Sequence, residues 1–121
     1  MKNSFLFIFS LLLTVAAFGQ SSKLVKAEIK VYGNCGMCKV RIQKALDRTG
    51  IKTANWDTKT KNLAVVYNSE KLTELDIHKF IAEVGHDTDK AKAKDEVYAK
   101  LPFCCLYRDH DHSGMEDGDH R

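Results

Sequence analysis

The sequence predicts an α+β fold in which two helices cover one face of a four-stranded antiparallel sheet. Three observations support this prediction. Some segments alternate apolar and polar residues, as half-buried strands do. Other segments repeat their apolar residues every three or four positions, as amphipathic helices do. The two kinds follow one another in the order strand, helix, strand, strand, helix, strand, which is the split βαβ, or ferredoxin-like, arrangement.

The first nineteen residues are not expected to belong to this fold. A positively charged start precedes an apolar stretch over residues 5–15, and the small residues Ala17 and Gly19 follow it. This layout is typical of a cleavable secretory signal. The apolar stretch is too short to span a bilayer comfortably, although a retained membrane anchor is the alternative. We therefore predict a signal peptide over residues 1–19 and a periplasmic or secreted protein without a stable membrane span after cleavage.

The predicted domain covers residues 20–93 and begins with a strand and a helix. Apolar residues alternate with lysines and a glutamate over residues 23–32, so one side of this strand should be buried. Residues 36–48 change to a helical period that places Cys38 on the inner face, and Gly50 can end this helix.

The second half of the domain should hold a hairpin, a helix and an edge strand. Residues 51–57 and 63–67 alternate again around a polar turn, which predicts the hairpin. Thr73 can cap a second helix, on which we expect His78 to lie at the surface. A weaker fourth strand is expected over residues 88–93, where three nearby lysines would discourage pairing with another chain.

Beyond the domain, the chain should form a short extension and a tail. Over residues 94–108 we expect one or two helical turns that stop before Pro102, and an adjacent pair of cysteines follows this proline. Residues 109–121 are polar and acidic without an apolar period, so we expect disorder there without metal.

Charge and length exclude some classes of function. The 121 residues carry 19 Lys and Arg against 16 Asp and Glu, and the positive charges are scattered along the domain. An exported chain with scattered lysines is not expected to bind nucleic acid, although its positive charge could help an acidic partner to dock. A domain of this size also has little room for a deep enzymatic cleft.

The segment Cys35-Gly36-Met37-Cys38 lies where the first strand leads into the first helix. The unpaired N–H groups and the positive end of a helix stabilise a thiolate, so the pKa of at least one of these thiols should be lowered. Two intervening residues let both sulfurs reach one ion. Two thiolates alone underfill a tetrahedral zinc site and suit a soft ion that accepts few ligands, above all Cu(I). A local disulfide is the alternative.

These segments resemble the heavy-metal-associated domain, the family of small copper chaperones, mercury-scavenging periplasmic proteins and N-terminal modules of metal-pumping ATPases. The resemblance rests on residues 33–38, the helix after them, the strand over 63–67 and the turn over 84–87, and it covers about residues 23–93. It implies a ferredoxin-like fold and a soft ion on the two cysteines, Cu(I) first and Hg(II), Ag(I), Zn(II) or Cd(II) as alternatives. It further implies transfer to a metal-transporting ATPase or another metal-binding protein, and no enzymatic activity.

Two positions depart from the pattern of this family. Where the family usually carries Met two residues before the first cysteine, this chain has Gly33, which would loosen or shorten the loop. Where bacterial members often carry Tyr after the glycine that ends the second helix, this chain has His86. We consider His86 as a third ligand or as a hydrogen-bond donor to a sulfur, with a solvated loop histidine as the alternative.

The extension and the tail could supply secondary ligands. A disulfide between the adjacent Cys104 and Cys105 would be strained, so these residues could bind metal, pair with other cysteines or be buried. The tail contains imidazole and thioether groups suited to transition metals, namely those of His110, His112, Met115 and His120. Its acidic residues also resemble the start of a calcium loop, but the bidentate Glu is missing and calcium is not expected.

The sequence therefore favours an exported protein that buffers, scavenges or transfers a soft metal, above all Cu(I), by thiolate ligand exchange. One alternative is a thiol–disulfide oxidoreductase, because a CxxC at a helix start is also a redox motif. The order of elements argues against it, and the single proline, Pro102, lies beyond the domain. Another alternative is a structural, partner-binding domain with a local disulfide.

Overall fold

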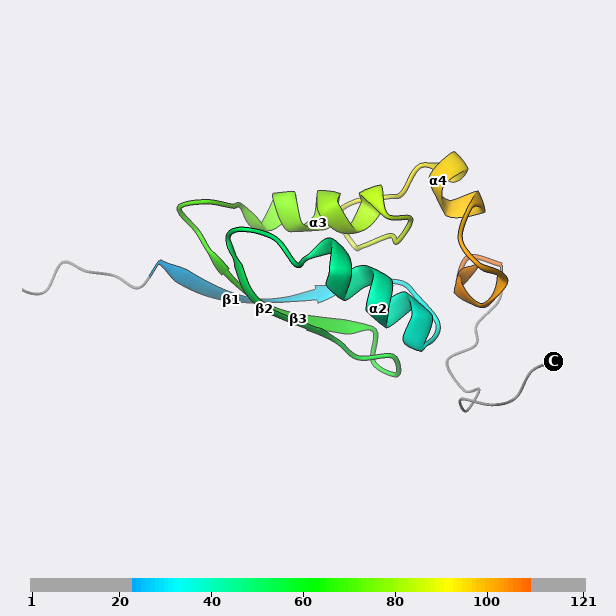
Figure 1. Cartoon of the computed structure of the whole chain (residues 1–121), viewed down its shortest axis with the longest axis horizontal. Helices are drawn as coiled ribbons and strands as arrows, with labels where there is room; N and C mark the ends of the chain where they lie inside the picture. Colours follow the sequence, from blue (N-terminus) through cyan, green and yellow to red (C-terminus); the bar gives the residue numbers. More distant parts are fainter. Residues whose placement is uncertain (1–22, 110–121) are drawn as a thin grey trace, which may run out of the picture.

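The computed structural model describes residues 23–109 (Figure 1). The predicted signal peptide lies outside the described residues, as do His110, His112, Met115 and His120 of the tail. The elements are β1 (Leu24–Lys30), α2 (Gly36–Ala45), β2 (Ile51–Trp56), β3 (Asn62–Asn68), α3 (Glu74–Glu83), α4 (Asp95–Ala99) and the short 3-10 helix η1 (Phe103–Cys105). Within residues 23–109, no helix combines the length and the apolar character that a membrane span requires.

The three strands form one antiparallel sheet in the order β1-β3-β2. The central strand β3 buries Leu63, Val65 and Tyr67, whereas the residues between them are exposed or half-buried. This alternation is the one the sequence predicts, because successive side chains of a strand point to opposite faces. The sheet therefore has one apolar face that other elements must cover.

Helices α2 and α3 cover that face together (Figure 1). α2 contributes Cys38 and Ile42 to the core, and α3 contributes Ile77 and Ile81. All four side chains are fully buried, and burial of an aliphatic side chain of this size stabilises the fold by about 1.5–3 kcal/mol. Because Cys38 is part of this core, the geometry of the cysteine pair depends on the packing of α2 against the sheet.

The start of α3 agrees with the prediction, but the position of His78 does not. The hydroxyl of Thr73 accepts a hydrogen bond from the Asp76 N–H, and the Asp76 carboxylate accepts one from the Thr73 N–H, which makes a capping box worth about 1 kcal/mol. His78, which we expected at the surface, is fully buried, with Nδ1 2.5 Å from the Thr88 hydroxyl. The hydroxyl partner of His78 comes from a distant segment, which periodicity does not reveal.

The expected fourth strand does not form. Near residues 88–93 the chain pairs with the end of the first strand only through a single bridge, between Val31 and Thr88. The Thr88 hydroxyl accepts hydrogen bonds from the N–H groups of Lys90 and Ala91, which bends the backbone into a turn. The α+β class is thus confirmed, whereas the prediction of a four-stranded sheet is wrong for the described chain.

The extension after residue 94 packs against the domain instead of projecting from it. Its residues Tyr98, Leu101 and Cys105 belong to the same buried cluster as the sheet and the two long helices. Figure 1 shows η1 beside the end of the molecule where α2 begins. The extension therefore brings a segment distant in sequence close to Cys35 and Cys38.

Candidate metal centre

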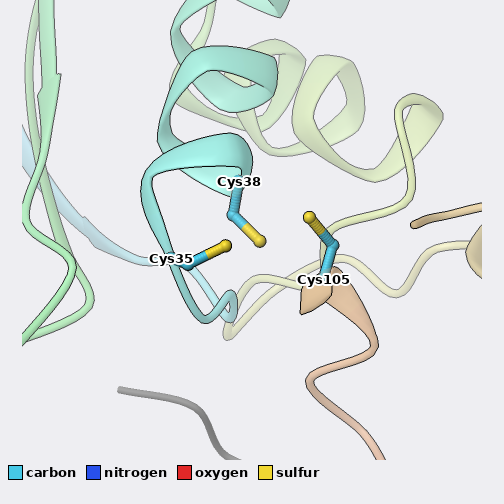
Figure 2. A group of neighbouring side chains, drawn as sticks. All are labelled: Cys35, Cys38 and Cys105. Atoms are coloured by element: carbon cyan, nitrogen blue, oxygen red, sulfur yellow. The ribbon is translucent and has the colours of Figure 1, made fainter. Parts of the chain in front are cut away.

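Three cysteine sulfurs meet at the start of α2. The Sγ atoms of Cys35, Cys38 and Cys105 all lie within 4.8 Å of one another. Figure 2 shows Cys35 and Cys38 side by side at the first turn of the helix, with Cys105 facing them from the extension. All three are free thiols. Because metal–sulfur bonds are about 2.3 Å long, sulfurs at such separations can bind one ion together.

The turn between strand and helix places the first two sulfurs. Cys35 is the N-cap residue of α2 in an extended conformation, and its carbonyl accepts a hydrogen bond from the N–H of Lys39. Cys38 follows one helical turn later, and the N–H of Asn34 donates to its sulfur over 3.4 Å. A helix start with a cysteine on either side of its first turn therefore directs both sulfurs to one side, as the CxxC spacing predicts.

Solvent reaches the three sulfurs unequally. Cys38 and Cys105 have an exposed fraction of 0%, whereas Cys35 is half-buried. The burial of Cys38 agrees with the helical period that places it on the inner face, so only Cys35 of the pair is open to solvent. An incoming ion, or the thiolate of a partner, would thus meet Cys35 first.

The cluster favours one thiolate at neutral pH. A hydrogen bond from the Cys105 thiol, helped by backbone N–H groups, lowers the pKa of Cys38 to about 5. Burial raises the pKa of Cys35, and donation to the Cys38 sulfur raises the pKa of Cys105. The predicted lowering of one thiol pKa is confirmed for Cys38. Its main cause is the thiol of the extension, which no local argument from the helix start could supply.

A cation adjoins the cluster. The Nη1 of Arg41, one turn further along α2, lies 3.3 Å from the Cys105 sulfur and donates a hydrogen bond to it. A guanidinium at this distance stabilises negative charge on the sulfur. Arg41 could not be identified from the sequence, because only the fold brings it near Cys105.

Close packing leaves no room for a side chain at Gly33. A Cβ atom at this position would lie 2.9 Å from Cη2 of Trp56 and 3.1 Å from the Cβ of Cys38. Trp56 is fully buried, and its Nε1 donates a hydrogen bond to the Val31 carbonyl. The indole ring therefore fills the space beside residues 33–36, which we call the metal loop. The expectation of a looser loop is wrong.

His86 is buried and does not belong to the sulfur cluster. Its exposed fraction is 0%, so the alternative of a solvated loop histidine is wrong. Its Nδ1 lies 2.8 Å from the Tyr32 carbonyl, an acceptor, which places the proton on Nδ1 and leaves a lone pair on Nε2. Burial lowers its pKa, and Nε2 has no partner among the described residues. The structure brings Cys105 rather than His86 to the cysteine pair; ligation by His86 stays a prediction.

Cys104 has different surroundings from its neighbour Cys105, although their sulfurs lie 3.8 Å apart. Its thiol lies 3.3 Å from the Met37 sulfur and is partly exposed. Its carbonyl accepts a hydrogen bond from the Asn34 side chain, which ties the extension to the metal loop. Cys104 is thus outside the three-sulfur cluster, and the two adjacent cysteines have different surroundings.

Known structures share this fold. The CopZ metallochaperone matches with a TM-score of 0.51 and 24% identity over 53% of this chain and 98% of its own. The putative copper-ion-binding protein from Bacillus anthracis str. Ames matches with a TM-score of 0.53 and 22% identity, over 57% and 100%. The N-terminal soluble domains of Bacillus subtilis CopA match with a TM-score of 0.50 and 25% identity, over 55% and 46%. No family model and no curated protein matches the chain.

These matches span little more than half of this chain, which is less than its described part. Part of the described structure therefore has no counterpart in those proteins. The shared fold and the two cysteines at the start of α2 support the resemblance of residues 23–93 to the heavy-metal-associated domain family.

Proposed function

We propose that this protein is an exported Cu(I)-binding protein that buffers, scavenges or transfers the ion through the thiolates of Cys35 and Cys38. The observation that carries the proposal is the convergence of these two sulfurs at the start of α2, with one of them open to solvent. The fold is also that of a metallochaperone and of the N-terminal domains of CopA, so a role in metal transfer suits it.

The composition of the cluster supports a soft ion. All its ligand atoms are sulfurs, and no carboxylate or imidazole of the described residues joins it. Thiolates select Cu(I) and related soft ions, whereas Zn(II) usually takes four protein ligands in a closed site. Ag(I) and Hg(II) would bind by the same chemistry, and Zn(II) or Cd(II) would need a further ligand. Cu(I) is the soft ion that accepts few thiolate ligands, and it is therefore the ion we propose.

Transfer would proceed by exchange of sulfurs. A partner thiolate approaches from the side of Cys35, which solvent reaches, and bonds to the ion before Cys35 leaves it. Cys38, buried in the core, would be the last ligand of the pair to be released. The partner we propose is a metal-transporting ATPase or another metal-binding protein. In an oxidising compartment, bound metal would also protect these thiols from disulfide formation.

Two assays on the reduced protein, kept free of oxygen, test this function. Titration with Cu(I) against a chromophoric chelator should give submicromolar binding, and an insulin-reduction assay should give no activity. Reductase activity without Cu(I) binding would instead favour the thiol–disulfide oxidoreductase. Fractionation of cells and sequencing of the mature N-terminus test export, since cleavage is expected before Gln20.

A further inference from the structure

We propose that Cys105 is a third metal ligand, so that the extension completes a three-thiolate site around the ion. The inference rests on the proposed function, metal binding by Cys35 and Cys38. It adds a ligand that the CxxC pair cannot supply, from a segment beyond the region that resembles the heavy-metal-associated domain.

The distances suit three ligands of one ion. Three sulfurs bound in a plane around a metal, each by a bond of about 2.3 Å, lie roughly 4 Å apart. The three sulfurs of the cluster are already within 4.8 Å of one another. Cys105 faces the pair from the opposite segment (Figure 2), so small side-chain adjustments could close the triangle.

The extension is fixed to the domain by contacts on both sides of Cys105. Before it, the Asn34 side chain donates a hydrogen bond to the Cys104 carbonyl over 3.2 Å. After it, the Tyr107 hydroxyl donates to the Gly85 carbonyl over 2.7 Å. The Arg108 guanidinium then binds both carboxylate oxygens of Asp87, at 2.7 and 2.9 Å. The Cys105 sulfur is thus held in place, as a preorganised ligand must be.

A cation beside Cys105 would offset part of the negative charge of a three-thiolate site. Three thiolates with Cu(I) carry two excess negative charges, and buried charge without compensation is costly. Arg41 Nη1 lies 3.3 Å from the Cys105 sulfur and supplies one positive charge at the site. A cysteine that served only to fill the core would have no need of a guanidinium on its sulfur. On binding, each thiol that becomes a ligand releases its proton to solvent.

The third ligand would change what the protein does with its metal. A partner must displace three sulfurs instead of two, and two of the three have an exposed fraction of 0%. Release should therefore be slower than from a two-thiolate carrier. The site then favours buffering or scavenging of Cu(I) over rapid transfer.

X-ray absorption on the Cu(I)-loaded full chain tests this inference directly. We expect three sulfur neighbours in the wild type and two, at a shorter distance, in the double variant Cys104→Ser/Cys105→Ala. The double variant is needed because the Cys104 sulfur lies 3.8 Å from that of Cys105 and could replace it. The single variant Cys104→Ser is the matched control and should keep three sulfurs.

Affinity gives a second readout. We expect the double variant to bind Cu(I) at least about 10-fold more weakly than the wild type, since even loss of an outer-shell partner of a metal ligand typically costs that much. Cys104→Ser should stay within about twofold. Circular dichroism checks that each variant is folded, and if the double variant is not, the sulfur count of the wild type still decides.

The outcomes separate the two proposals. Two sulfurs in the wild type, with unchanged affinity in the double variant, would overturn the role of Cys105 and leave binding by the CxxC pair intact. A wild type that binds no Cu(I) would overturn both proposals.

Discussion

The two cysteine pairs of this protein behave differently because of their spacing. Cys35 and Cys38 are separated by one helical turn, so their sulfurs converge. Cys104 and Cys105 are adjacent, and their surroundings differ: Cys104 is partly exposed and contacts Met37, whereas Cys105 is buried in the core. In this protein the CxxC spacing alone brings two sulfurs together, whereas the fold decides that Cys105, and not Cys104, joins them.

Cysteine variants of each pair should produce the largest difference. Cys38→Ser removes a buried ligand at the centre of the cluster, and we expect the Cu(I) affinity to fall more than about 100-fold, or roughly 3 kcal/mol. Cys104→Ser, outside the cluster, should change it less than about twofold. Competition with a chromophoric Cu(I) chelator measures both. Equal losses in the two variants would remove the distinction between the pairs.

The stability of the reduced, metal-free protein should depend on pH through Cys38. Its pKa is lowered to about 5 in the fold, against about 8.5 in an unfolded chain. Between these values the unfolded state binds more protons, so the free energy of unfolding should rise with pH from about 5 to 8.5. This contribution of Cys38 is present in full above about pH 8.5, and it is lost as the pH falls through about 5. Urea unfolding of the wild type and of Cys38→Ser checks this: the variant should show a smaller rise, and parallel curves would contradict it.

The ion pair between Arg108 and Asp87, which fixes the extension to the domain, should matter for both stability and metal binding. Arg108→Ala leaves the partly buried Asp87 carboxylate without its guanidinium, which we expect to cost about 2 kcal/mol in the free energy of unfolding. It should also weaken Cu(I) binding, because Cys105 loses its support. Lys100→Ala, at an exposed position of the same segment, is the control. Unfolding by urea and chelator competition measure the two effects; destabilisation without weaker binding would separate the extension from the site.

The packing of the metal loop can be tested with two glycines. Gly33→Ala forces a Cβ against the Trp56 ring and should destabilise the protein by about 1–3 kcal/mol. Gly36→Ala, in the same loop, meets nothing within 4 Å and lies in the first turn of α2, so it should be neutral or slightly stabilising. Thermal unfolding of the two variants gives the answer, and similar melting temperatures would refute the packing argument.

A small effect is also expected at His86. His86→Phe keeps an aromatic ring beside Tyr107, on which the imidazole stacks with centroids 5.3 Å apart. Because the sulfur cluster does not include His86, we expect the Cu(I) affinity of the variant to stay within about threefold of the wild-type affinity at each pH from 5 to 8. A larger loss, growing with pH as a neutral imidazole would require, would make His86 a ligand after all.

Several elements follow from local pattern alone. The strands β1, β2 and β3, the helix α2 and the capping box at Thr73 appear where alternation, period and capping residues place them. The CxxC pair could be identified in the same way, since its geometry depends on a single helical turn. The missed features each depend on a distant partner: His78 is buried against Thr88, and Gly33 is confined by Trp56.

The sequence by itself determined the α+β class and the position of the cysteine pair, and from that pair it predicted a soft ion, because all three depend on residues a few positions apart. Only the tertiary structure decided that Cys105 and Arg41 lie together near that pair, 64 positions apart in the chain. The physical reason is that such contacts arise when the extension buries its apolar side chains against the domain, anchored by Asp87 and Arg108. That packing converts a pair of sulfurs into a cluster of three.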